Sequence, residues 1–155
     1  MSQILLLGIG NPGRRDDGLG PALAEAFERL AIPGLSIDAG YQLQVEDAAA
    51  IAEHRIVVFA DADAAGAEPF SFLRVKPVRG LSFSSHSLEP SALLALAEEA
   101  LGARPEAWLL GIRGYEFGEL AEGLTDRARD NLRQAIEFIE PWLRERTMRD
   151  EADSC

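Results

Sequence analysis

The chain has few of the residues that build disulfides or zinc knuckles. Its 155 residues include one cysteine, Cys155, which is the last residue, and two histidines, His54 and His86. A single cysteine excludes an intramolecular disulfide and a metal site made from paired cysteines. We therefore expect Cys155 to be a thiol without a structural role at the end of the chain.

Positive charge and long apolar runs are also scarce. The 15 Lys and Arg residues face 26 Asp and Glu residues, which gives a formal net charge of −11. Such a polyanion repels the phosphate backbone, so we expect no nucleic-acid partner. No apolar run approaches the roughly 18 residues of a membrane span, and residues 1–13 have neither a basic region nor a cleavage site typical of a signal peptide. These features predict a cytoplasmic protein without a membrane partner.

The composition is that of one globular domain. Hydrophobic residues make up 47% of the chain and charged residues 26%, and a chain of this length buries roughly 70% of the surface that it exposes when unfolded. We expect a single domain over residues 1–147. Residues 148–155 have no apolar periodicity and are expected to be a disordered tail.

Strand and helix patterns alternate along the chain. Apolar runs predict strands at residues 3–7, 35–40, 55–63 and 106–112. Apolar residues at helical spacing predict helices at residues 19–30, 45–52 and 90–101, and from an N-cap at Thr125 onward, with Pro141 as a kink or stop. Residues 72–78 alternate and contain Pro77, which is typical of an edge strand. The pattern predicts a three-layer α/β/α sandwich around a mostly parallel sheet of about five strands, one of them an edge strand.

In an open α/β sheet, ligands bind beyond the carboxyl ends of the parallel strands. Asp16 and Asp17 follow the first predicted strand, Asp61 and Asp63 end the third, and His86 precedes a predicted helix. We therefore expect acids and an imidazole to converge at this edge. Individually, Asp17 could simply cap a helix, and Asp61 could simply cap a turn.

The spacing of Gly8, Gly10 and Gly13 is that of a dinucleotide-binding loop, G-x-G-x-x-G. However, Asp16 and Asp17 then follow where a phosphate would need positive charge, and the helical pattern begins only near residue 19. Asp38 could mimic the acid that binds ribose, so a nucleotide-binding protein remains an alternative.

The stretch GIGNPG, residues 8–13, also resembles the start of peptidyl-tRNA hydrolases. Those enzymes continue with a run that supplies their catalytic histidine, whereas this chain continues RRDDGLG. The acidic composition also argues against a tRNA substrate.

The ordered set of motifs resembles the hydrogenase maturation endopeptidases most closely. The G-x-G-N loop followed by an acid, VVFADAD at residues 57–63, SSHSLEP at 84–90 and LLGIRGYEFGELAEGLT at 109–125 each have a counterpart in that family. The matches cover most of residues 4–132. Each motif alone is weak evidence, but their common order is specific.

The resemblance implies that Asp17, Asp61 and His86 recognise nickel and also serve catalysis, with the nucleophile left open. Asp16 and Asp63 are alternative or supporting ligands, because the family often has Glu at the first position. The nickel would arrive inside the precursor of a hydrogenase large subunit, from which the enzyme removes a C-terminal extension. Zinc or cadmium could occupy the site adventitiously.

Two further expectations concern the partner protein. Tyr41, Tyr115 and Phe117 follow predicted strands and could offer aromatic surface for docking the precursor, although packing beneath loops would explain them equally well. A non-enzymatic alternative is a maturation factor that binds the nickel centre of the precursor and cuts nothing.

Overall fold

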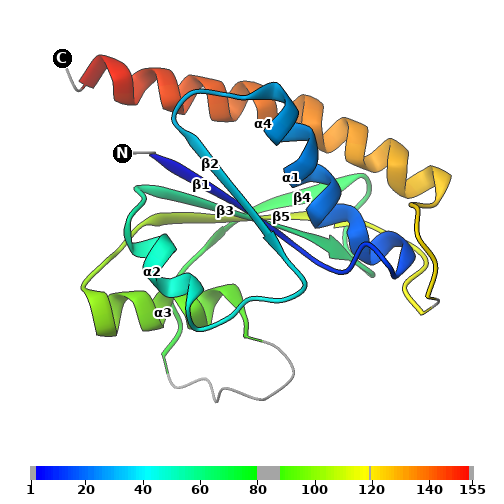
Figure 1. Cartoon of the computed structure of the whole chain (residues 1–155), viewed down its shortest axis with the longest axis horizontal. Helices are drawn as coiled ribbons and strands as arrows, with labels where there is room; N and C mark the ends of the chain where they lie inside the picture. The colour runs from blue at the N-terminus through cyan, green and yellow to red at the C-terminus, as the bar shows by residue number, and fades with distance from the viewer. Residues whose placement is uncertain (1–2, 80–87, 119, 154–155) are drawn as a thin grey trace.

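The computed structural model describes residues 3–79, 88–118 and 120–153 (Figure 1). The strands are β1 (Ile4–Ile9), β2 (Leu35–Gly40), β3 (Ile56–Asp63), β4 (Phe70–Val75) and β5 (Glu106–Arg113). The helices are α1 (Leu19–Leu30), α2 (Asp47–Ala52), α3 (Pro90–Leu101) and α4 (Asp126–Asp153), and the short 3-10 helix η1 (Arg15–Gly18) precedes α1.

The strands form one sheet in the order β2-β1-β3-β5-β4. The first four strands of this order are parallel, and β4 pairs antiparallel with β5 at one edge. The predicted sheet of mostly parallel strands with an edge strand is therefore confirmed. The edge strand ends at Val75, so Pro77 lies beyond it and removes no hydrogen bond from the sheet.

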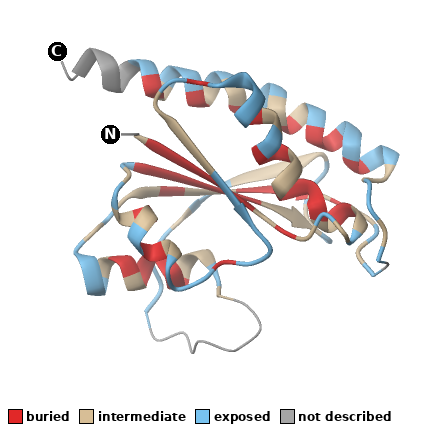
Figure 2. Ribbon diagram, in the orientation of Figure 1, coloured by how far each residue is buried: buried red, intermediate tan, exposed pale blue. Residues whose placement is uncertain are grey.

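Alternate residues of β1 enter two separate hydrophobic cores. Ile4 and Leu6 belong to the core shared with α1 and α4, whereas Leu5 and Leu7 belong to the core shared with α2 and α3. The strand is apolar throughout because both of its faces are covered. Figure 2 shows the resulting buried layer between the two helix layers, which confirms the three-layer sandwich.

Helix α1 packs directly against the backbone of the sheet at Gly20. A Cβ atom at this position would lie 2.3 Å from the carbonyl oxygen of Ile9 and 2.4 Å from that of Ala60. Only glycine permits this approach. The first turn of α1 therefore lies against β1 and β3 close to their carboxyl ends.

Helix α4 is longer than the sequence predicts. Thr125 caps its N-terminus as expected, because its hydroxyl accepts the N–H of Ala128 at 3.3 Å. The helix continues through Pro141 to Asp153. Pro141 is exposed, so water can satisfy the carbonyl that its missing N–H leaves free. Helix α4 thus includes residues 148–153, for which the sequence predicts a disordered tail. No helix in the described ranges is both long and apolar enough to cross a membrane.

Candidate functional site

A cleft of about 250 Å³ opens where β1 and β3 end. Asp17 from η1 and Asp61 from β3 both line it, because β1 and β3 are adjacent parallel strands. The remaining lining residues come from the end of β1, the segment after β2 and the start of α3: Ile9, Gly10, Tyr41, Gln42, Leu43, Leu88, Glu89 and Pro90. The structure thus brings two of the predicted site residues into one cleft.

Asp17 is half-buried and holds the loop that follows β1. Its Oδ2 accepts the backbone N–H of Asn11 at 2.8 Å, and the Asn11 side chain accepts the N–H of Gly13 at 2.9 Å. In a nucleotide cradle such N–H groups point at a phosphate. Here a carboxylate satisfies the N–H of Asn11, which argues against the nucleotide-binding alternative.

The carboxyl group of Asp61 is strained electrostatically. Burial, together with the negative charges of Asp17, Glu89 and Asp63, raises the pKa of Asp61 to about 7, although the N–H of Ala62, which donates to Asp61 at 2.8 Å, opposes this shift. Three acids around one carboxylate disfavour its ionised form. A cation placed in the cleft would relieve this repulsion.

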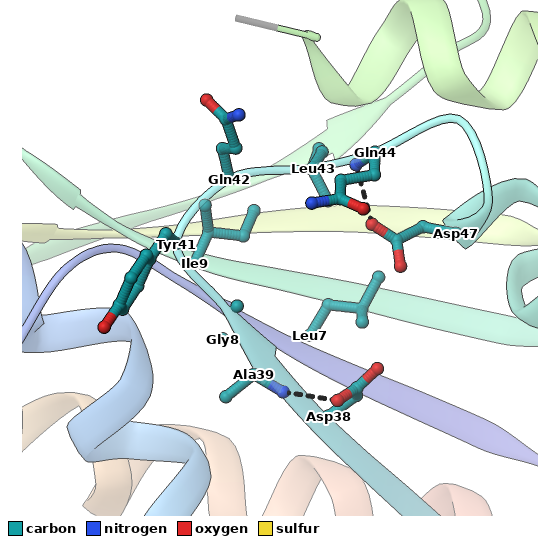
Figure 3. A pocket seen from close by; sticks show the side chains of 11 residues that line it. Leu7, Gly8, Ile9, Asp38, Ala39, Tyr41, Gln42, Leu43, Gln44 and Asp47 are labelled. Carbon is teal, nitrogen blue, oxygen red and sulfur yellow. Dashed lines mark hydrogen bonds between the residues drawn. The ribbon is translucent and has the colours of Figure 1, made fainter.

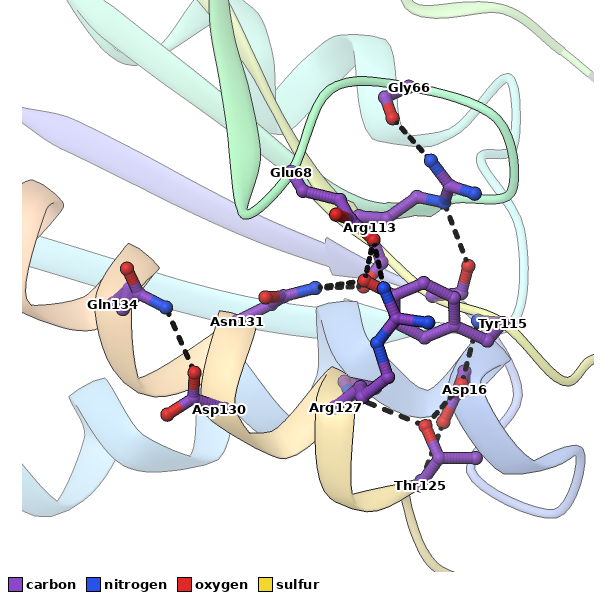
Figure 4. Close-up of polar contacts among 12 residues, drawn as sticks. Asp16, Gly66, Glu68, Arg113, Tyr115, Thr125, Arg127, Asp130, Asn131 and Gln134 are labelled. Carbon is purple, nitrogen blue, oxygen red and sulfur yellow. Dashed lines mark hydrogen bonds and ion pairs between the residues drawn. The ribbon is translucent and has the colours of Figure 1, made fainter.

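Asp16 lies next to Asp17 in sequence but has entirely different surroundings (Figure 4). It is fully buried, and its carboxylate accepts the N–H of Tyr115 at 2.8 Å, that of Glu116 at 3.1 Å, and both the N–H and the hydroxyl of Thr125 at 2.8 Å. Burial alone would raise the pKa of Asp16, but these four hydrogen bonds outweigh it and lower the pKa. Asp16 is therefore a structural anchor rather than a cleft ligand.

Asp63 also has a structural environment. Its Oδ1 accepts the N–H groups of Ala65 at 3.0 Å and Gly66 at 2.8 Å, which closes the turn after β3. This is the usual role of an aspartate at the start of a turn. Asp63 influences the cleft only through its charge near Asp61.

Two of the three aromatic residues expected at a docking surface are partly buried. The hydroxyl of Tyr115 donates to Glu68 and accepts from Asn131 at 2.9 Å, and Arg127 stacks on its ring at 4.1 Å. Phe117 is also half-buried. Packing of the 114–125 segment thus accounts for both residues.

Tyr41 is 74% exposed and borders two adjoining clefts. The second cleft has a volume of about 200 Å³, lies beside the ends of β1 and β2, and contains Asp38, Gln44 and Asp47 (Figure 3). Ile9, Tyr41, Gln42 and Leu43 line both. The two clefts therefore adjoin along these four residues.

Comparison of the sequence with known proteins identifies no family, because no protein-family model and no curated protein matches it. Solved structures do match. The maturating endopeptidase HybD from E. coli aligns with a TM-score of 0.75 and 24% identity over 92% of this chain and 93% of that chain. The fold is that of the hydrogenase maturation endopeptidases.

Two proteins from Thermococcus kodakarensis extend the comparison. The nickel–iron hydrogenase maturation protease HycI from this organism has a TM-score of 0.67 and 25% identity, covering 89% of this chain and 90% of its own. HybD from the same organism has a TM-score of 0.68 and 18% identity, covering 90% and 98%. The structural neighbours thus confirm the resemblance to hydrogenase maturation endopeptidases that the ordered motifs indicate.

The third residue that this resemblance assigns to nickel, His86, lies outside the described residues. Leu88 and Glu89, which follow the segment 80–87, line the cleft that contains Asp17 and Asp61. Among the described residues, no group of three or more His, Cys, Asp or Glu side chains is arranged to hold a metal ion. The described part of this endopeptidase fold therefore supplies three carboxylates at the cleft, those of Asp17, Asp61 and Glu89.

Sequence reasoning missed the contribution of Glu89 to the cleft. Glu89 precedes Pro90 at the N-terminus of α3. The position follows from a simple rule, since a helix that begins at the carboxyl edge of the sheet places the residue before it at the crevice.

Proposed function

We propose that this chain is an endopeptidase that removes a C-terminal extension from the nickel-loaded precursor of a nickel–iron hydrogenase large subunit. The observation that carries the proposal is the pairing of Asp17 and Asp61 in one cleft of a hydrogenase maturation endopeptidase fold. The reaction is hydrolysis of one peptide bond. Water supplies the hydroxyl for the new carboxylate of the mature subunit, and the extension leaves with a new amino terminus.

Nickel enters this proposal as part of the substrate. Carboxylates bind divalent cations, and the repulsion from Asp17 that adds to the effect of burial on the pKa of Asp61 would fall when a cation lies between the two. Together with His86 these residues would offer two oxygens and one nitrogen, leaving coordination positions for groups of the precursor. The cleft would thereby distinguish loaded from empty precursor.

The same reasoning predicts weak binding of free metal. Three ligands do not complete the four to six positions that nickel usually takes, so the isolated protein should bind Ni²⁺, Zn²⁺ or Cd²⁺ with low affinity. Titration calorimetry with the full chain measures this directly. Absence of any binding up to millimolar metal, together with normal processing by Asp17→Ala, Asp61→Ala and His86→Ala, would contradict the ligand assignment.

The decisive experiment is incubation of the protein with a nickel-loaded large-subunit precursor and, in parallel, with the same precursor lacking nickel. Mass spectrometry should detect a released C-terminal peptide only from the loaded form. Release from both forms would contradict nickel recognition. Binding of the loaded form without release would instead support the non-proteolytic maturation factor.

A further inference from the structure

The geometry points to Asp16 as a positioning residue: its buried carboxylate holds the turn that presents Asp17 to the cleft at a set place relative to Asp61. This inference deepens the proposed function and, for its effect on processing, rests on it. Asp16 is distinct from the residues that would touch the substrate.

The first step is that Asp16 cannot reach the cleft itself. It is fully buried, its Oδ2 accepts three donors and its Oδ1 accepts one, all from Tyr115, Glu116 and Thr125. A carboxylate has about four acceptor sites in total. All of these acceptor sites are therefore used by Tyr115, Glu116 and Thr125. Figure 4 shows the bonds of Asp16 to Tyr115 and Thr125.

The second step is that η1 has further attachments to the same segment. The N–H of Asp16 donates to the carbonyl of Glu116 at 2.9 Å, and the N–H of Arg15 donates to the carbonyl of Ala121 at 2.9 Å. The guanidinium of Arg15 also forms an ion pair with Glu116 at 3.2 Å. The turn is thus also fixed by two main-chain bonds, which Arg15 and Asp16 donate.

The third step connects this segment to the strand that carries Asp61. The N–H of Gly114 donates to the carbonyl of Asp63 at 3.0 Å, at the end of β3. A Cβ atom on Gly114 would lie 2.8 Å from the Cβ of Asp16, so the two backbones meet without a spacer. One continuous set of contacts therefore runs from η1 through Asp16 to the end of β3.

The consequence appears at Asp17. Its carboxylate leaves η1 on the side of the cleft and accepts the N–H of Asn11 at 2.8 Å. Because the Asn11 amide donates to Asp17 and not to Asp16, it reports the position of the Asp17 carboxylate separately from the anchor. A shift of η1 should break this bond.

The test compares Asp16→Asn with wild type and with Asn131→Ala. In Asp16→Asn the NH2 group of the new side chain would face N–H donors of Tyr115 and Thr125, which need an acceptor. Asn131→Ala instead removes the nearby hydrogen bonds to Tyr115 and Arg113 and leaves the contacts of Asp16 in place. We expect Asp16→Asn to lower kcat/KM for the loaded precursor by about tenfold or more, as loss of groups that orient a metal ligand usually does. Asn131→Ala should retain near-wild-type processing at a temperature where both variants are folded.

Hydrogen exchange supplies a readout that a merely structural role would not move. In Asp16→Asn the Asn11 amide should exchange about tenfold faster relative to the central β3 amide of Val58, which reports global opening. In Asn131→Ala this ratio should be unchanged. An unchanged ratio in Asp16→Asn, or equal kcat/KM in both variants, would overturn the inference.

A second pair of variants, with smaller changes at Thr125, tests the inference if Asp16→Asn does not fold. Thr125→Ser keeps the hydroxyl that donates to Asp16, and Thr125→Val removes it. Only Thr125→Val should speed exchange at Asn11 and lower kcat/KM, whereas equal behaviour of the two would count against the inference. If wild type releases no peptide, the proposed function fails, while the Asn11 amide still tests whether Asp16 positions Asp17.

Discussion

Asp16 and Asp17 are neighbours in sequence, yet one is saturated with hydrogen bonds and the other faces a cleft shared with Asp61. The carboxylate of Asp16 has four donors and a lowered pKa, whereas Asp61 has one backbone donor, three acidic neighbours and a raised pKa. Carboxylates that stabilise a fold have hydrogen-bond donors around them, whereas carboxylates that bind a ligand have few partners in its absence. The difference separates the structural acid from the two acids that we propose to bind the metal of the precursor.

The largest expected effect is on activity at the cleft. Asp17→Asn and Asp61→Asn should each reduce processing of the loaded precursor by at least about a hundredfold, because a neutral amide no longer attracts the cation. The melting temperature of the metal-free protein should be unchanged or raised. Peptide release and thermal unfolding measure the two outcomes.

The matched control for these variants is Glu53→Gln, an exposed acid outside the cleft, which should leave both values unchanged. A folded Asp17→Asn variant that processes at the parental rate would show that Asp17 only holds the loop after β1, because the side-chain carbonyl of Asn can also accept the N–H of Asn11.

The next effect sharpens the comparison through stability. Asp16→Ala should lower the free energy of unfolding by about 3–4 kcal/mol, because several buried donors lose their acceptor. Urea denaturation followed by circular dichroism provides the measurement, with Asp17→Ala as the matched variant. A loss for Asp17→Ala as large as that for Asp16→Ala would remove the distinction between the two acids.

A smaller effect concerns pH. Asp61 binds its proton more tightly in the folded chain, since its pKa is raised to about 7. Its contribution to the free energy of unfolding is therefore highest below about pH 4, falls as the pH rises to about 7 and stays low above that. Asp61→Asn should consequently be more stable than wild type by about 2–3 kcal/mol at pH 8, with the difference lost near pH 4. A difference independent of pH would contradict the raised pKa.

The smallest effect concerns docking. Tyr41→Ala should leave stability within about 0.5 kcal/mol of wild type, as at most exposed sites, and should weaken binding of the precursor several-fold. Leu73→Ala, at a 63% exposed residue on β4, is the matched control and should change neither. Equal binding by both variants would remove Tyr41 from the docking surface.

Much of the architecture could be predicted from the sequence, because strands buried on both faces are continuous apolar runs. The convergence of Asp17 and Asp61 also follows, since Asp17 lies in the segment that follows β1 and Asp61 lies near the end of the adjacent parallel strand β3. The role of Asp16 could not be predicted, because its partners Tyr115 and Thr125 lie 99 and 109 positions further along the chain. The sequence predicts a kink or stop at Pro141, but helix α4 continues beyond it because the exposed face of the helix tolerates the missing N–H.

The contact at Gly20 fixes the distance between helix α1 and the sheet beneath the site. The backbone of α1 lies against the carbonyl oxygens of Ile9 and Ala60 with no side chain between them. Ile9 ends the strand that precedes Asp17, and Ala60 precedes Asp61 in β3. A methyl group at this position would act as a wedge under α1 and move η1 outward with it. Side chains at the rim can reshape the entrance of the cleft, but the distance between Asp17 and Asp61 also depends on this main-chain contact, which leaves no room for a side chain at residue 20.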